Sequence, residues 1–221
     1  MISHLALIMD GNRRWAKKQG LLAWKGHRKG VDNVEMAIKF CIKQGVKFLS
    51  LYTFSLENMN RSETEKKYLF ELIETMRGRV QEFVDQNIKI RFVGDHSLMT
   101  DSLRELCAEI EAVTSHGTAL QCNFLFFYGG RQEIVHAAQE LQKQGINITE
   151  SSLREHLWSG NIPDPELVIR TGGFQRLSNF LLFQAAYAEL QFLDILWPDL
   201  TEQDLEQALE NYLGVQKNLG R

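Results

Sequence analysis

The chain has 221 residues, of which 44% are hydrophobic and 24% charged, a composition that is ordinary for one globular domain. Its formal net charge is −3, so the overall charge does not indicate a nucleic-acid partner, and any anion site has to be local. Cys41, Cys107 and Cys122 lie far apart without CxxC spacing, which argues against a disulfide framework and a zinc site. We find no secretory leader and no apolar run of about 18 residues, and therefore expect a cytoplasmic protein.

The first predicted element is a buried strand over residues 4–9, which ends at Asp10 and a turn at Gly11. Four basic residues follow at the start of a predicted helix, where free backbone N–H groups and the helix dipole attract anions. The carboxylate of Asp10 is a ligand that suits a hard divalent cation such as Mg²⁺. This segment therefore predicts a site for a magnesium-bound diphosphate.

Strands and helices then alternate to the end of the chain. This order predicts an α/β fold with a central, mainly parallel six-stranded sheet flanked by helices, in a single domain over residues 1–221. The other predicted strands span residues 46–54, 88–93, 119–128, 166–169 and 186–196, and the predicted helices lie near residues 31–44, 68–84, 98–113, 134–141, 150–158 and 201–212.

Four polar motifs follow predicted strand ends, which is where ligands bind in such sheets. Each contains residue types that bind phosphate, although any one of them alone would be typical of a turn or a solvated helix face. No P-loop or dinucleotide fingerprint occurs, so a nucleotide is not the favoured anion. The motifs are Asp10-Gly-Asn-Arg-Arg-Trp15, Phe54-Ser-Leu-Glu-Asn58 with Arg61, Tyr128-Gly-Gly-Arg131, and Arg170-Thr-Gly-Gly173 with Arg176 and Ser178.

In this order, the motifs resemble those of the cis-prenyltransferases, the family of undecaprenyl diphosphate synthase. Further matches are Gly26-His27, Ser178-Asn-Phe-Leu, Tyr187-Ala-Glu-Leu190 and Leu196-Trp-Pro-Asp199, so the resemblance extends over almost the whole chain. It implies the condensation of an allylic diphosphate with isopentenyl diphosphate to give a cis-prenyl diphosphate.

The resemblance also implies roles for individual residues. Asp10, Asn12 and Asn58 would be catalytic, and Asp10 and Glu189 would hold Mg²⁺. The segment from Phe54 to Arg61 would close over the substrates, and the growing chain would lie in an apolar tunnel between the sheet and the helix of residues 68–84. By spacing alone, the apolar stripe of that helix is equally typical of ordinary core. The implied substrate-binding residues are Gly11, Arg13, Arg14, Trp15, His27, Ser55, Glu57, Met59, Arg61, Arg170, Arg176 and Ser178.

Four residues depart from the family pattern near the expected reaction centre. Ala23 replaces an arginine, Met59 a tryptophan, Phe127 an asparagine and Phe174 an acidic residue. Two enzymatic hypotheses follow: standard elongation to an undecaprenyl-type or shorter product, or a specialised synthase that makes a short or branched, head-to-middle (lavandulyl-type) product. The primer, the product length, the regiochemistry, the general base and the pathway are left open.

Two hypotheses from another class are a non-catalytic subunit that supports an active partner and a generic phosphate-binding domain. The intact first motif, from Asp10 to Trp15, argues against the former. The resemblance further implies a homodimer with the region after Asn179 at its interface. A lipid product implies transient contact with a membrane surface, and no nucleic acid is expected as a partner.

Overall fold

The computed structural model describes residues 2–214 and has a six-stranded sheet at its centre. The strand order is β3-β4-β2-β1-β5-β6, and every neighbouring pair is parallel, which confirms the predicted α/β sheet. The strands are β1 (His4–Ile8), β2 (Phe48–Ser55), β3 (Ile88–Val93), β4 (Leu120–Tyr128), β5 (Leu167–Arg170) and β6 (Glu189–Phe192).

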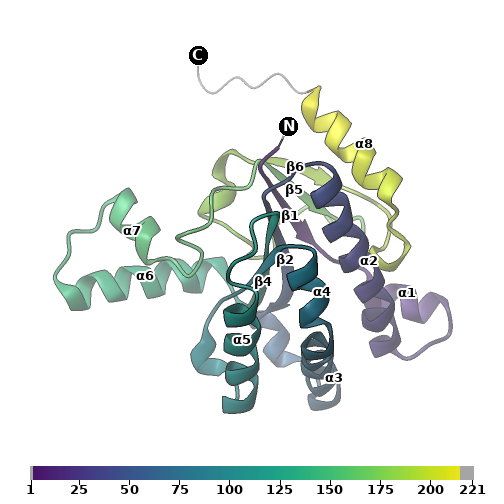
Figure 1. The fold of residues 1–221 in the computed structure, drawn as a ribbon, viewed down its shortest axis with the longest axis horizontal. Helices are drawn as coiled ribbons and strands as arrows, with labels where there is room; N and C mark the ends of the chain where they lie inside the picture. The colour runs from purple at the N-terminus through teal and green to yellow at the C-terminus, as the bar shows by residue number, and fades with distance from the viewer. Residues whose placement is uncertain (1, 215–221) are drawn as a thin grey trace.

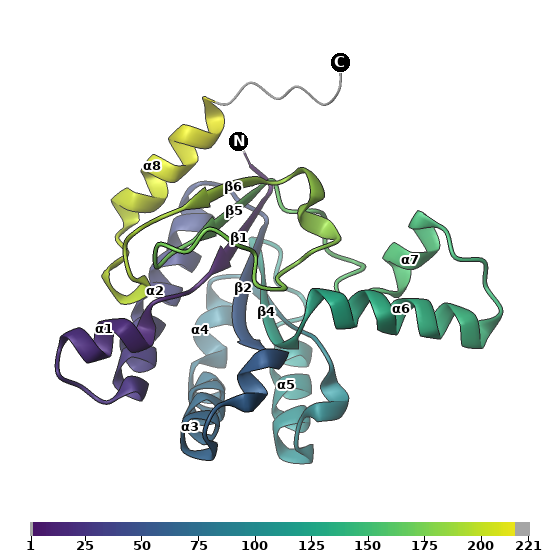
Figure 2. The same ribbon diagram turned by 180° about the vertical axis from the view of Figure 1, so that it is seen from behind.

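Helices connect the strands and cover the sheet (Figure 1). Helices α6 and α7 project from the body as a hairpin, whereas α1 and its turn into α2 lie at the opposite edge of the molecule (Figure 2). The α-helices are α1 (Asn12–Lys18), α2 (Ala23–Lys43), α3 (Glu63–Glu74), α4 (Val80–Asp85), α5 (Asp101–Val113), α6 (Gly130–Gln144), α7 (Glu150–His156) and α8 (Glu202–Leu213). Short 3₁₀ helices are η1 (Leu56–Asn60), η2 (Thr75–Arg79), η3 (His96–Leu98), η4 (Gln184–Tyr187) and η5 (Trp197–Asp199).

Strands β1, β4 and β5 are buried along almost their whole length, as expected for a parallel sheet covered on both faces. Alternate side chains of β1 therefore enter two separate cores. Leu5 and Leu7 pack in the larger core, together with residues of α2, α3, α5 and α8. Ala6 and Ile8 pack in the smaller core, together with Phe180.

The predicted long helix of residues 68–84 is broken into α3, η2 and α4. The break contains Gly78, a residue with low helix propensity, and Thr75 donates its hydroxyl hydrogen to the carbonyl oxygen of Leu72 at 2.6 Å. The single-helix prediction was therefore wrong, and residues of all three segments line the cavity described below.

The predicted strand of residues 186–196 is also shorter than expected, because only Glu189–Phe192 pair with β5. The residues before it form η4, and those after it turn towards β1, where the Trp197 N–H donates to the carbonyl oxygen of Asp10 at 3.0 Å. Apolar character alone did not distinguish these two segments from an edge strand.

The register of the sheet brings the predicted motifs to one edge. Ile8 lies beside Arg170 across β1 and β5, and Ser55 lies beside Tyr128 across β2 and β4. Ser55, Tyr128 and Arg170 belong to three of the polar motifs, and the fourth motif begins at Asp10, two residues after Ile8.

Candidate active site

Asp10 lies between two arginines at the end of β1. One carboxylate oxygen accepts a hydrogen bond from Arg14 Nη2 at 3.1 Å, and the other accepts one from Arg170 Nη2 at 2.8 Å. Arg14 also donates to the carbonyl oxygen of Gly172 at 2.6 Å. The first and last motifs are therefore joined by side-chain contacts that fix two guanidinium groups beside one carboxylate.

The loop after β5 is organised around Arg170, whose side chain is 4% exposed. Its Nη1 donates to Ser178 Oγ at 2.7 Å and to the carbonyl oxygen of Arg176 at 2.6 Å. Arg176 Nε donates to the same hydroxyl oxygen at 3.2 Å. Ser178 has a φ of 49°, a left-handed conformation that is uncommon for a residue other than glycine and is stabilised here by these contacts.

The ring of Phe174 lies among three guanidinium groups. Its centroid is 4.3 Å from Cζ of Arg176, 4.6 Å from Cζ of Arg14 and 5.9 Å from Cζ of Arg170. The faces of aromatic rings attract cations, so the ring partly compensates the repulsion among these like charges. Unlike the acidic residue that the family pattern predicts here, it adds no negative charge.

A polar cleft of ≈ 770 Å³ opens beside this cluster at the ends of β1, β2 and β5. It contains seven of the predicted site residues: Asp10, Ser55, Glu57, Asn58, Arg61, Arg170 and Ser178. Asn179 Nδ2 closes part of its wall by donating to Glu57 Oε1 at 2.8 Å. The cleft thus combines cationic groups with hydroxyl and amide groups, which is the chemistry that binds phosphate oxygens.

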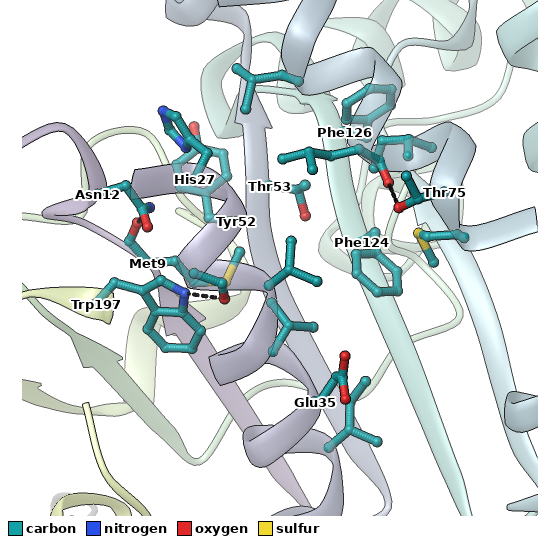
Figure 3. Close-up of a pocket in the computed structure, with 18 of the residues that line it drawn as sticks. Met9, Asn12, His27, Glu35, Tyr52, Thr53, Thr75, Phe124, Phe126 and Trp197 are labelled. Carbon is teal, nitrogen blue, oxygen red and sulfur yellow. Dashed lines mark hydrogen bonds between the residues drawn. The ribbon is translucent and has the colours of Figure 1, made fainter. Parts of the chain in front are cut away.

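A second, largely apolar cavity of ≈ 180 Å³ lies between the sheet and helices α2, α3, η2 and α4. Figure 3 shows Asn12 and His27 together in one part of it and Glu35 well away from them, with Phe124 and Phe126 on the sheet side. The cavity and the cleft share part of their walls, so a ligand with a polar head and an apolar tail could occupy both. The shared residues are Met9, Tyr52, Asn58 and Arg61.

Asn12 and α2 approach each other closely beside the cavity. A side chain on Gly30 would collide with the amide oxygen of Asn12, and one on Gly26 would collide with the Asn12 backbone carbonyl. Asn12 Nδ2 donates to the carbonyl oxygen of Met9 at 3.1 Å, whereas its buried Oδ1 has no hydrogen-bond partner.

Glu65, at the start of α3, lies near three predicted site residues. Its Oε1 is 3.0 Å from Arg61 Nη1, 3.6 Å from His27 Nε2 and 3.9 Å from Arg13 Nε. Burial lowers the pKa of His27 to about 4, and the positive charge of Arg61 acts in the same direction. His27 is therefore neutral near pH 7. The charged neighbours of Glu65 are then Arg13 and Arg61, and Glu65 orients both guanidinium groups.

The remaining predicted residues lie around the cleft or away from it. Gly11, with a φ of 113°, forms the turn before α1, and Trp15 Nε1 donates to Asp199 Oδ1 at 2.6 Å. Met59 is exposed on η1. Glu189 lies beside Leu167 at the opposite end of β5 from Arg170, so one copy of the chain does not bring it to Asp10.

The donor set near Asp10 fits a magnesium ion held mainly by its substrate. Among residues 2–214, no group of three or more His, Cys, Asp and Glu side chains is placed to hold a metal ion. Mg²⁺ commonly takes one or two protein carboxylates and completes its octahedron with phosphate oxygens and water. One carboxylate beside a cleft suited to diphosphates meets that requirement.

Sequence reasoning missed Tyr52, Glu65, Glu35 and Arg79. Glu65 stands four residues after Arg61, but Arg61 lies before the start of α3, so the helical i,i+4 rule does not predict their contact. Tyr52 lies in the expected strand, and its hydroxyl donates to the Ser178 carbonyl oxygen at 3.3 Å. The contact between Glu35 and Arg79 joins residues 44 positions apart and had no local signal.

Residues 8–220 match the family model described as "Putative undecaprenyl diphosphate synthase". An isoprenyl transferase of Neisseria gonorrhoeae is 41% identical over 220 residues, covering 99% of this chain and 89% of the relative. The ditrans,polycis-undecaprenyl-diphosphate synthase ((2E,6E)-farnesyl-diphosphate specific) of Escherichia coli K12 is 41% identical over 225 residues, covering 98% of this chain and 89% of the relative.

Two solved structures share the fold over the whole chain. The lavandulyl diphosphate synthase from Lavandula x intermedia, in complex with dimethylallyl diphosphate, has a TM-score of 0.94 at 34% identity and covers 100% of this chain and 98% of that one. A Campylobacter jejuni structure, described as "a probable undecaprenyl diphosphate synthase", has a TM-score of 0.86 at 31% identity and covers 100% of this chain and 99% of that one.

Proposed function

The chain belongs to the undecaprenyl diphosphate synthase family, and on that basis we propose that its cleft joins an allylic diphosphate to isopentenyl diphosphate. The chain is a prenyltransferase of the cis-prenyltransferase type. The observation that carries the proposal is the junction of a polar, arginine-lined cleft with an apolar cavity. Diphosphates suit the former and a prenyl chain suits the latter.

The two diphosphates occupy different parts of the cleft in this proposal. The allylic diphosphate lies near Asn12, Arg14 and His27, so its hydrocarbon part enters the apolar cavity. Isopentenyl diphosphate lies near Arg170 and Ser178, which already contact each other at 2.7 Å. Little side-chain rearrangement is then needed when it binds.

The cationic side chains stabilise the departing diphosphate while the allylic carbon becomes electron-deficient. The double bond of isopentenyl diphosphate attacks that carbon, and a proton is lost to leave the new double bond. Asn58 lies where the cleft and the cavity meet, so we propose that it contacts the reacting region. The segment from Phe54 to Arg61 would reduce the access of water by closing over the substrates.

Mg²⁺ is part of the proposal, with Asp10 as its protein ligand. When bound, the ion would neutralise diphosphate charge and favour the departure of the leaving group. Asp10 would also keep Arg14 and Arg170 in place through its two hydrogen bonds. Glu189 stays a predicted ligand, although the fold places it at the other end of β5.

A short or branched product is the second candidate. Phe124 and Phe126 take up space beside a cavity of ≈ 180 Å³, which favours a short hydrocarbon chain. The likeness to a lavandulyl diphosphate synthase fits this candidate, but only weakly, because undecaprenyl synthases are also similar. A cytoplasmic location, a homodimer, an extended tunnel and contact with a membrane surface also remain predictions.

A product assay tests the proposal directly. The purified chain would receive Mg²⁺ and isopentenyl diphosphate with dimethylallyl, geranyl or farnesyl diphosphate in turn, or dimethylallyl diphosphate alone, and mass spectrometry would identify the products. A long polyprenyl series would support undecaprenyl-type elongation, whereas one short product would support the second candidate. We expect Asp10→Ala to abolish product formation. A wild-type chain without product would contradict the proposal and favour the partner-subunit hypothesis.

A further inference from the structure

The turn between α1 and α2 presents two leucines to solvent at the edge of the molecule. Leu21 is 38% exposed and Leu22 is 62% exposed, and Gly20 just before them has open space around its Cα. Exposed apolar residues are common when scattered singly, but two adjacent leucines at the tip of a turn form a small protrusion. Figure 2 shows this turn at the outer edge of the fold, on the opposite side from the α6–α7 hairpin.

The leucines are surrounded by unneutralised positive charge. Residues 11–31 contain seven lysines and arginines and no acidic residue, although the whole chain has a net charge of −3. Three of the seven contact carboxylates: Arg13 with Glu65, Arg14 with Asp10 and Lys29 with Asp32.

The other four basic residues are exposed and make no salt bridge within the described chain. We call these four and the two leucines the α1–α2 patch: Lys17, Lys18, Leu21, Leu22, Lys25 and Arg28. Two of the lysines form the last turn of α1, and the other two cations lie on the first turns of α2. The patch therefore combines an apolar tip with four cations that no carboxylate of residues 2–214 neutralises; Lys25 Nζ also lies 5.7 Å from the centroid of the Trp24 ring.

We propose that the α1–α2 patch docks on the surface of an anionic lipid bilayer. Lysine and arginine are attracted to anionic headgroups, and exposed leucines insert at the boundary between headgroups and acyl chains. Because the rest of the chain carries an excess of negative charge, the α1–α2 patch is the part of the molecule that an anionic surface attracts most strongly. The charge complementarity between the α1–α2 patch and the anionic lipid surface therefore favours binding and also sets which side of the protein faces the lipid.

Helix α2 carries residues of both the α1–α2 patch and the wall of the apolar cavity. Gly26 and His27 follow Lys25 directly, and His27 lines the cavity. Docking would hold the cavity near the lipid, where an apolar product can be released without crossing water. This consequence rests on the proposed function, but the docking itself does not require turnover.

Vesicle binding tests the docking without substrates. The purified protein would be mixed with vesicles of phosphatidylcholine alone or of phosphatidylcholine with phosphatidylglycerol, and the bound fraction would be measured by flotation. We expect binding to the anionic vesicles only, with a decrease at high salt because the charges become screened. Leu21→Ser combined with Leu22→Ser should lower the partition coefficient about tenfold or more.

Two exposed isoleucines at a distant site provide the matched control. Ile146 and Ile148 are 42% and 56% exposed and lie on the distant α6–α7 hairpin. Replacing both with serine should leave vesicle binding unchanged, and circular dichroism would confirm that both double variants are folded. A wild-type chain that does not bind anionic vesicles would overturn the proposal.

Equal binding by the leucine variant and the wild type would also overturn it, because Leu21 and Leu22 would then contribute nothing to docking. Retained docking in a protein without product would instead contradict the proposed function while leaving the patch as a lipid-binding surface.

Discussion

At the scale of single residues, the setting of Phe174 bears on how the cleft holds a diphosphate. Three guanidinium groups lie within 6 Å of its ring centroid, and each of them also faces the region of Asp10 or Ser178. The ring attracts these cations without competing for them as a carboxylate would. Phe174 therefore keeps the arginines together while leaving their charge available to a ligand.

Phe174→Ala should lower the affinity for inorganic pyrophosphate about two- to fivefold, because an exposed cation–π contact contributes about 0.5–1 kcal/mol. Phe174→Tyr should bind like the wild type, since it retains the ring. Isothermal titration calorimetry would measure both. Phe183→Ala is a suitable control, because that ring lies 5.4 Å from Arg154, outside the cleft. Unchanged binding by Phe174→Ala would contradict this role.

Two buried histidines make the stability of the protein depend on pH. Burial lowers the pKa of His4 to about 4, and burial together with Arg61 lowers that of His27 to about 4, from an ordinary value of 6.5. Between these values the unfolded chain takes up protons that the folded chain does not. The free energy of unfolding should therefore decrease as the pH falls from 6.5 towards 4, by roughly 2–3 kcal/mol per histidine.

His4→Gln should remove about half of this decrease, and urea unfolding at several pH values would measure it. The expectation follows from burial: His4 Nδ1 donates to the Pro163 carbonyl oxygen at 2.6 Å and its Nε2 lies 2.8 Å from Ser50 Oγ, inside the protein where a charged ring is poorly solvated. The exposed His116 provides the control, since His116→Gln should leave the slope unchanged. A slope in His4→Gln equal to that of the wild type would show that other groups dominate.

At the scale of elements, an ion pair between α2 and the break after α3 bounds the apolar cavity. Glu35 contacts Arg79, and both residues line this cavity and also a smaller hollow beyond it. Arg79 additionally donates to Glu82 of α4 at 2.8 Å, and these two carboxylates raise its pKa. The ion pair thus lies in the wall that the cavity and the hollow share, and Arg79 is the last residue of η2, directly before α4.

Replacing both Glu35 and Arg79 with alanine should lengthen the product, because the two hollows would merge and no charge would meet the end of the hydrocarbon. We expect an increase of at least one five-carbon unit in the product mass spectrum. Replacing both members of the exposed pair between Lys43 and Glu202, 2.6 Å apart, should not change the product. An unchanged product in the Glu35 and Arg79 variant would indicate that Phe124 and Phe126 limit the chain length.

At the scale of the whole molecule, β6 is an edge strand with exposed apolar neighbours. Tyr187 is 83% exposed and Leu190 is 40% exposed, within the region where the family pattern implies the interface of a homodimer. Tyr187→Lys with Leu190→Lys should convert such a dimer into a monomer, because burying two charges is unfavourable. Analytical ultracentrifugation would measure this, with Val113→Lys, on α5, as the control. A monomeric wild type would contradict the homodimer prediction.

Much of the architecture was predictable from the sequence, because strands with continuous apolar runs and helices with regular apolar spacing have local signals. The sequence predicts that Asp10 and Arg170 lie close together, since parallel strand ends meet at one edge of the sheet, but it does not predict their hydrogen bond. The break at Gly78 and the short β6 were not predicted, because tertiary packing decides whether such segments continue. The contacts of Glu65 and Glu35 depend on side-chain directions that periodicity does not specify.

The central position of β1 in the sheet has a consequence for folding during synthesis on the ribosome. Its Leu5 pairs with Leu49 on one side and with Leu167 on the other, so one edge of the strand stays unpaired until most of the chain has been synthesised. Such long-range pairing slows folding and leaves a nascent sheet edge open to wrong partners. The anion-binding cluster forms only when β5 docks, so the emerging chain acquires its catalytic chemistry as one of its last folding events.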